Sequence, residues 1–305
     1  MMPNIAFKSI LFPVDFSEAC ALTAPHVLRL AKQMGASVTL LHVIPWLSGW
    51  NGQSEIRWTV SGHAQMRDME TREAKDLQIF QQKFFPHFHC RLELRCGGVA
   101  GTITETAGSL GCDLIMMPTR GHGQGHEHPF LIGSTTAQVL HDARCAVWTS
   151  SRLKEPDEFA GIQHIICMVD QQDIPTGYVE AAGRLAAFFG AKLTFVSAVP
   201  ARGPEHQDQD VAHLCDGLMI TLLGSVDEVL RQITATVQTD LVLANHGHLQ
   251  QPFGKFRTHA YQIIAESPCP VLNLCICSDQ QDNDHAGSAQ QAFNPVSTQE
   301  VSHAD

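Results

Sequence analysis

The sequence predicts an α/β protein made of two similar domains, each a five-stranded parallel sheet with helices on both faces. Two observations carry this prediction. A strand–helix–strand pattern opens the chain, and the same pattern returns 155 residues later. Strand, helix and strand within about 35 residues form a βαβ unit, and its strands are parallel because the helix carries the chain back across the sheet.

The first unit begins with an apolar run at 9–15, which predicts a buried strand. Ser17 is a suitable N-cap for the helical pattern that follows as far as Met34. Gly35 is typical of a helix end, and the run at 36–45 predicts a second buried strand. Further strands are expected near 91–96, 113–117 and 145–149, so the first copy reads as alternating strands and helices.

The repeat is visible residue by residue. Asp170 and Gly190 stand 155 residues after Asp15 and Gly35, and GAKLTFVSAVP aligns with GASVTLLHVIP without a gap. Later in the chain CDLIMM pairs with TDLVLA, and RCAVWTS pairs with PCPVLNL at an offset of 124. Self-similarity of this kind indicates a duplicated structural unit.

The smaller second offset means that the second copy lacks about 31 residues between its second and third strands. In the first copy the corresponding region, 46–84, contains a Trp/Gly-rich loop and a long helical pattern, whereas 201–217 has room only for a short stub. We therefore expect a complete domain at 1–150 and a shortened, degenerate one at 151–277. The polar residues 278–305 are expected to form a disordered tail.

The fifth strands, AVWTS and PVLNL, are expected to pair with each other and join the two copies into an intramolecular pseudo-dimer. A homodimer of whole chains is left open.

Composition disfavours several classes of binding partner. The chain has 31 acidic and 20 basic residues and a net charge of −11, which disfavours nonspecific binding to nucleic acid or to an anionic membrane. No apolar run approaches the roughly 18 residues that span a bilayer, and the N-terminus does not read as a secretory signal. We expect a cytoplasmic protein, and its ten scattered cysteines, without a Cys-x-x-Cys pair, read as reduced structural thiols.

Four separated segments carry a family resemblance: ILFPVDFSE, LLHVIP, DLIMMPTRGHG and IGSTTAQVLHDARCAVW. Their order and spacing resemble the universal stress protein family in its tandem two-domain form. The resemblance implies a flavodoxin-like fold (adenine nucleotide alpha hydrolase-like) and frequent dimerisation. In one branch of the family it also implies binding of ATP or a related adenine nucleotide, and Mg²⁺ is left open as a companion ion.

The nucleotide-binding branch has a loop of the form Gly-x2-Gly-x9-Gly-[Ser/Thr] after the fourth strand. Its glycines let backbone N–H groups approach phosphates, and the start of the next helix adds donors and a positive dipole end. One alignment puts Pro118 and Gly121 at the first two glycine positions, with eleven residues before Gly133. The other puts Arg120 and Gly123 there and keeps the nine-residue spacing, so either one glycine is missing or the loop is longer.

The resemblance implies a set of nucleotide-contacting positions at the carboxyl edge of the first sheet. The acid after the first strand would meet the nucleoside, and the backbone of Val43 would meet the adenine. Read from residues alone, Asp15 is equally a strand-end helix cap, and Ser134 is equally an ordinary N-cap. The full set is Pro13, Val14, Asp15, Val43, Met117, Pro118, Arg120, Gly121, Gly123, Gly133, Ser134 and Thr135.

The second copy departs from the pattern in another way. Gly247 and the nine-residue spacing are present, but Arg257-Thr258 stands where a glycine should start the helix. Asp170 is kept, while Met168 replaces the counterpart of Pro13. We interpret this copy as one kept for packing and dimerisation.

Two other groups of residues near the loop have alternative readings. His122, His126 and His128 could ligate a metal, but the glycines around them disfavour the helix that H-x3-H spacing needs, so solvated side chains are the simpler reading. Trp46, Trp50 and Trp58 could cover an adenine or pack beneath a helix.

No Walker-type motif occurs and the loop has no lysine, so we expect no robust catalysis and leave slow ATP hydrolysis open. The sequence thus supports a stress-response regulator or chaperone-like factor that binds an adenine nucleotide in its N-terminal domain. The alternative is a nucleotide-free interaction or dimerisation module of the same fold. A metal-responsive protein that uses the loop histidines is the third hypothesis.

Overall fold

The structure is a computed structural model of the 305-residue chain. It describes residues 7–45, 60–120, 132–150, 161–169, 174, 177–199, 211–214, 217–245, 263–265 and 267–275. Among these residues no helix is both long enough and apolar enough to cross a membrane.

The N-terminal half alternates strands and helices as predicted, and each of its five predicted strands is present. Its elements are β1 (Ser9–Pro13), α1 (Glu18–Met34), β2 (Ser37–Pro45), α2 (Val60–Phe84), β3 (Cys90–Gly97), α3 (Val99–Ser109), β4 (Leu114–Pro118), α4 (Ser134–Asp142) and β5 (Ala146–Ser150). The C-terminal half contains β6 (His164–Met168), α5 (Tyr178–Phe189), β7 (Lys192–Val199), β8 (Val211–Leu214), β9 (Gly217–Leu223), α6 (Val226–Thr236), β10 (Leu241–Asn245) and β11 (Val271–Leu274).

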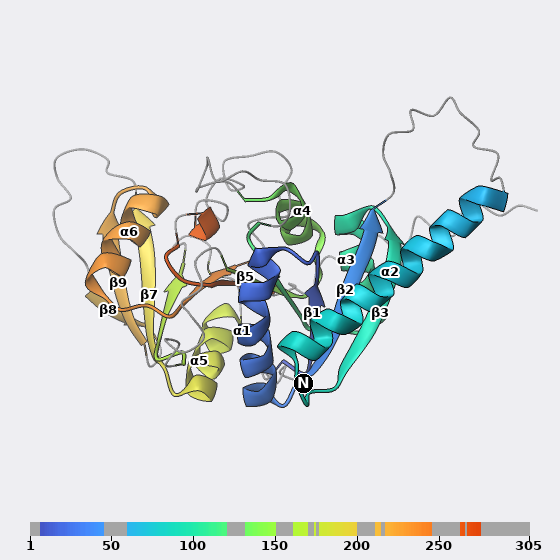
Figure 1. Cartoon of the computed structure of the whole chain (residues 1–305). Helices are drawn as coiled ribbons and strands as arrows, with labels where there is room; N and C mark the ends of the chain where they lie inside the picture. Colours follow the sequence, from blue (N-terminus) through green and yellow to red (C-terminus); the bar gives the residue numbers. More distant parts are fainter. Residues whose placement is uncertain are drawn as a thin grey trace, which may run out of the picture.

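All the described strands belong to one 11-stranded sheet with the order β3-β2-β1-β4-β5-β11-β10-β6-β7-β9-β8 (Figure 1). The first half reads β3-β2-β1-β4-β5 from its outer edge, and the second half reads β9-β7-β6-β10-β11 in the corresponding places. The strands of each set are parallel to one another. The predicted α/β fold class is therefore confirmed.

Strand β8 is the main departure from the sequence prediction. It lies antiparallel to β9 at the outer edge of the second half, in the region that was expected to hold only a stub. An antiparallel partner needs only a short turn, whereas a crossover helix needs a dozen or more residues. The shortened connection can therefore form a hairpin where the first half has room for α2.

The two halves meet through β5 and β11, and the predicted pairing of these strands is confirmed. The strands run antiparallel, with Val147 opposite Asn273, Trp148 opposite Leu272 and Thr149 opposite Val271. The offset of 124 residues between the two segments maps this register onto itself, with the Trp148–Leu272 pair at its centre. Such self-complementary pairing is the mark of an isologous contact.

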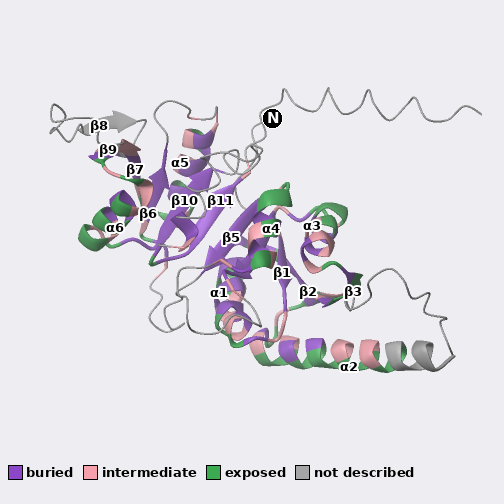
Figure 2. Ribbon diagram, turned by 90° about the horizontal axis from the view of Figure 1, so that it is seen from above, coloured by how far each residue is buried: buried purple, intermediate pink, exposed green. Residues whose placement is uncertain are grey.

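Buried side chains form two cores on the two faces of the sheet. Alternate strand residues enter different cores, as Phe12 and Leu11 of β1 illustrate. The first core also contains residues of α1, α2 and α5, and the second contains residues of α3, α4 and α6. Figure 2 shows the central strands as buried, while α2 and α6 keep exposed sides. Both cores continue across the junction between the halves.

The two halves also share a type of helix end and a pair of hydrogen bonds between strands, as expected for repeated units. Gly35 and Gly190 end their helices with nearly the same left-handed backbone, at φ 63° and 65°. Asp113, just before β4, accepts the N–H groups of Lys8 and Ser9 at 2.7 and 3.0 Å. Asp240, just before β10, does the same for residues 163 and 164 at 2.9 and 3.0 Å. Each acid thus fixes the first strand of its half against the fourth.

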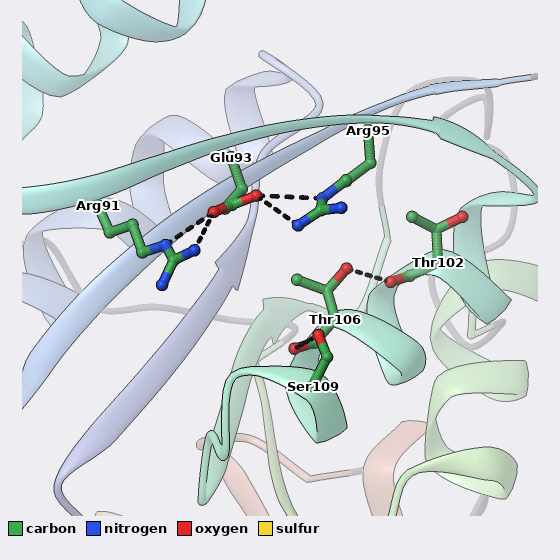
Figure 3. A network of polar contacts seen from close by, with 6 residues as sticks. All are labelled: Arg91, Glu93, Arg95, Thr102, Thr106 and Ser109. Atoms are coloured by element: carbon green, nitrogen blue, oxygen red, sulfur yellow. Dashed lines mark hydrogen bonds and ion pairs between the residues drawn. The ribbon is translucent and has the colours of Figure 1, made fainter.

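Strand β3 forms the other outer edge of the sheet and carries a row of charges on one face (Figure 3). Glu93 pairs with Arg91 at 2.6 Å and with Arg95 at 2.8 Å. Burial alone would raise the pKa of Glu93, but hydrogen bonds and charges from the two arginines hold that pKa below its ordinary value. Charged side chains on an edge strand discourage edge-to-edge association.

The junction yields a stability prediction. Asn273 is fully buried, and neither polar atom of its side chain has a hydrogen-bond partner among the described residues. Its counterpart Thr149 donates its hydroxyl to the Val271 carbonyl at 3.5 Å. Asn273→Thr should let the new hydroxyl reach the Val147 carbonyl in the same way and raise the free energy of unfolding by about 1 kcal/mol, measured by urea denaturation.

The reciprocal change Thr149→Asn is the matched control, and it should lower stability by about 1–3 kcal/mol because it buries a second unpaired amide. A loss of stability in Asn273→Thr would contradict the expectation and would mean that the Asn273 amide is satisfied by a group beyond the described residues.

Candidate functional site

The candidate site lies where the strand order of the N-terminal half reverses. β1 has β2 on one side and β4 on the other, so the chain leaves β1 in one direction and later returns to its opposite side. In open parallel sheets ligands bind outside the carboxyl ends of the strands at such a point. The carboxyl ends here are Pro13, Pro45 and Pro118.

The turn after β1 is organised around Asp15 and Ser17. Ser17 is the N-cap of α1, because its hydroxyl accepts the Cys20 N–H at 3.2 Å. The Asp15 carboxylate in turn accepts the Ser17 N–H at 3.0 Å. The cap predicted at Ser17 is confirmed, and half-buried Asp15 braces the turn rather than capping the helix itself.

Cys20 lies on the buried side of this turn. Its Sγ lies 3.6 Å from the Pro13 carbonyl oxygen, and the residue is buried. Burial raises the pKa of the Cys20 thiol well above its ordinary value, and the nearby Asp15 charge raises it further. The thiol therefore stays protonated and packs as part of the core.

Val14 and Val43 lie where β2 runs past the end of β1. The Val14 N–H donates to the Leu41 carbonyl at 2.8 Å, one residue beyond the last β1–β2 pair, Pro13 with Leu41. Val43 stands two residues further along β2, and its side chain is buried in the second core. Only the backbone of Val43 is therefore placed to meet a ligand at this edge.

On the other side of the reversal, the end of β4 is tied directly to the start of α4. The Thr119 N–H donates to the Ser150 carbonyl at 2.9 Å, and the Thr119 carbonyl accepts the Gly133 N–H at 3.0 Å. The Thr136 hydroxyl donates to the Pro118 carbonyl at 3.2 Å. These bonds hold the first turn of α4 against the carboxyl end of β4, beside buried Met117.

Gly133, rather than Ser134, is the N-cap of α4. Its φ of −60° and ψ of 145° are open to any residue, so backbone strain does not require glycine here. A Cβ at this position would lie 3.4 Å from the Thr119 carbonyl oxygen, and a longer side chain would project from the helix start. The interpretation of Ser134 as an N-cap is wrong, since it is the first helical residue and is exposed; Thr135 beside it is half-buried.

Several predicted residues lie outside the described part of the chain. Half-buried Arg120 is the last described residue before the loop. The others are Gly121, Gly123, His122, His126, His128, Trp46, Trp50, Trp58, Asp170, Gly247, Arg257 and Thr258. Within the described residues no group of three or more His, Cys, Asp or Glu side chains is arranged to hold a metal ion.

The structure adds residues that the sequence interpretation did not single out. Phe16 has a left-handed backbone at φ 60°, and its ring lies 4.6 Å from the ring of His42. His42 was readable as the one strongly polar residue in the buried run LLHVIP, whereas nothing in the sequence indicates a positive φ at an aromatic residue. At the end of β4, the buried hydroxyls of Thr119 and Ser150 have no partner among the described residues.

Residues 6–150 match the model of the universal stress protein family. This match supports assignment of residues 6–150 to the universal stress protein family. A universal stress protein from Methanocaldococcus jannaschii is 27% identical over 150 residues, which cover 49% of this chain and 85% of that relative.

Solved structures extend the likeness of fold beyond the universal stress protein match. A universal stress protein from Archaeoglobus fulgidus superposes with a TM-score of 0.60 and 15% identity, covering 92% of this chain and 100% of that one. A functionally unknown protein from Pseudomonas aeruginosa gives a TM-score of 0.56 at 15% identity, covering 89% and 94%. At these identities the superpositions show a shared fold only, and that shared fold includes both halves of the sheet.

The turn after β1 yields a chemical prediction. Iodoacetamide at pH 8 should leave Cys20 unmodified in the native protein, because the thiol is buried and its pKa is raised. Exposed Cys96 on β3 is the internal control and should be labelled before Cys20, as read by peptide mass spectrometry.

Asp15→Asn should leave Cys20 protected, since burial is a larger cause of its raised pKa than the Asp15 charge. Rapid labelling of Cys20 in that variant would show that the carboxylate, and not burial, protects the thiol.

Proposed function

We propose that the N-terminal half binds ATP or a related adenine nucleotide at the β1–β4 reversal, and that the protein acts as a stress-response regulator rather than as an enzyme. One observation carries the proposal. The glycine-started helix α4 is bonded to the end of β4 at the strand-order reversal, where the Asp15 turn follows the neighbouring strand β1.

The start of α4 suits a phosphate group. The first backbone N–H groups of a helix have no partner within the helix, and the positive end of the helix dipole adds to their attraction for an anion. Gly133 leaves this start free of a side chain, and Ser134 is exposed beside it. The hydroxyls of Thr119 and Ser150, which have no partner among the described residues, are further polar groups at the same edge, as expected where a polar ligand or ordered water completes the structure.

On the opposite side of the reversal, Asp15 and the backbone of Val43 would face the nucleoside. Asp15 is half-buried, which leaves part of it accessible to a ligand hydroxyl. Val43 follows the last β1–β2 pair, at the end of the sheet where an adenine would lie. Arg120 leads into the loop that would cover the phosphates, where its charge would offset theirs; in the same loop we assign Gly121 and Gly123 to the phosphate contacts.

We further propose that residues 1–150 and 151–277 are tandem universal stress protein domains that form a pseudo-dimer within one chain. The repeated strand order and the self-symmetric β5–β11 register support this organisation. In this scheme the second domain serves packing and pairing. A nucleotide-free interaction module built around the same β5–β11 pairing is the second candidate function.

The proposal is tested by native purification followed by analysis of the small molecules released on denaturation. Wild type should release an adenine nucleotide, or show a thermal shift with ATP and Mg²⁺. Gly133→Arg, which copies Arg257 of the second copy, should weaken binding at least about tenfold by filling the start of α4.

Gly98→Arg is the matched control for Gly133→Arg. Gly98 is also a glycine N-cap with a similar backbone, at φ −69° and ψ 119°, but it starts α3 after edge strand β3, away from the reversal. This variant carries the same added charge and should bind as wild type. Absence of nucleotide from wild type, together with no thermal shift in millimolar ATP, would sink the proposal and favour the interaction module.

A further inference from the structure

The turn between β1 and α1 has a backbone that its own sequence does not favour. Phe16 has a φ of 60°, in the left-handed region where a side chain crowds its own backbone. Such a conformation persists only when the surrounding structure imposes it, and it is concentrated at functional sites. The groups that impose it here are therefore of interest.

His42 on β2 is the centre of those groups. Its Nδ1 lies 2.7 Å from the carbonyl oxygen of Val14, immediately before Asp15. A carbonyl can only accept, so Nδ1 carries a hydrogen and donates it. The Phe16 ring packs on the imidazole with centroids 4.6 Å apart, and Phe80 of α2 meets Phe16 edge-on at 6.1 Å.

Glu73 of α2 holds the opposite side of the same ring. Its carboxylate lies 3.4 Å from His42 Nε2, and the two side chains are 31% and 12% exposed. A partner on each nitrogen fixes the rotation of the imidazole and keeps Nδ1 directed at Val14. The chain of contacts therefore runs from α2 through His42 to the residue that precedes Asp15.

The second half of the chain lacks this cluster. At the offset of 155 residues, Ser197 replaces His42 and Gln171 replaces Phe16, although Asp170 retains the acid. Where the first half has α2, the described part of the second half has strand β8. The cluster thus belongs to the one half in which we place the nucleotide.

We propose that His42 is a positioning residue for the nucleotide site, which holds the Val14–Phe16 turn, and with it Asp15, against β2, while Glu73 fixes the imidazole. The nucleotide part of this proposal rests on the proposed function. The positioning part concerns the ligand-free protein and stands or falls on its own.

Two variants separate the hydrogen bond from the presence of the ring. His42→Leu removes the donor, and His42→Asn keeps an N–H near the position of Nδ1. With ATP and Mg²⁺ as the probe, His42→Leu should bind about tenfold more weakly than wild type, because the Val14 carbonyl loses its partner and the turn is released. His42→Asn should recover most of that loss, and equal affinities for the two variants would overturn the role of the hydrogen bond.

A ligand-free readout keeps this test apart from nucleotide binding. The Ser17 amide, which donates to Asp15, should exchange its hydrogen faster in His42→Leu than in His42→Asn or wild type. The ¹⁵N NMR signal of His42 Nδ1 should be that of a protonated nitrogen. Unchanged Ser17 exchange in His42→Leu would refute the positioning role even if nucleotide binds. A wild type that binds no nucleotide, with these readouts as expected, would defeat only the proposed function.

Glu73→Ala guards against misfolding of the His42 variants. This variant changes no residue of the turn or of β2. Ser17 exchange in Glu73→Ala should increase less than it does in His42→Leu. Exchange equal to that of wild type in Glu73→Ala would show that Glu73 does not fix the imidazole.

Discussion

Parallel pairing of β1 with both β2 and β4 is the constraint on which the N-terminal half depends. Parallel neighbours can be joined only by long crossovers, which here are helices α1, α2 and α3 on the faces of the sheet. The same constraint brings the carboxyl ends of the strands to one edge and leaves a reversal of order beside β1. Asp15, Val43 and the start of α4 lie at this edge because of strand order, although they are far apart in the sequence.

The two halves share one strand order and differ where the shortened segment lies. In the first half α2 packs Leu77 and Phe80 into the first core and brings Glu73 to His42. In the second half a hairpin strand takes the place in the chain of that helix, and Ser197 stands where the imidazole would be. Without this helix the described part of the second half lacks both a covering layer and the contact that reaches the β1–α1 turn in the first half.

The fold was predictable because its signals are redundant. Apolar runs, helix caps such as Ser17 and Gly35, and an internal repeat all indicate the same βαβ order. The position of β8 was not predictable, because a four-residue strand that completes a hairpin depends on the free edge of β9 and not on its own pattern.

The candidate site was predictable only in part. The family resemblance pointed to Gly133 and Asp15, and the structure places them beside the carboxyl ends of neighbouring strands β4 and β1. The roles within each turn could not be predicted, since Gly133 is the N-cap because its backbone is extended and its carbonyl accepts the Ala137 N–H, the first bond of the helix. The left-handed backbone of Phe16 was the feature least predictable from the sequence. Tertiary contacts with His42 and Phe80 impose it against the local preference of the chain.

The antiparallel junction of β5 with β11 has an electrostatic consequence for the whole molecule. Each half starts its helices at the carboxyl edge of its own strands, and the junction turns the two edges to opposite ends of the sheet. The helix macrodipoles of the two halves therefore oppose each other and largely cancel at long range, while each edge keeps its own local positive potential. At physiological ionic strength the net charge of −11 is largely screened beyond about a Debye length, so an anion meets the field of one edge only at close range. Recognition of an anionic ligand must then rest on short-range backbone donors, and it should depend only slightly on the charge of the rest of the surface.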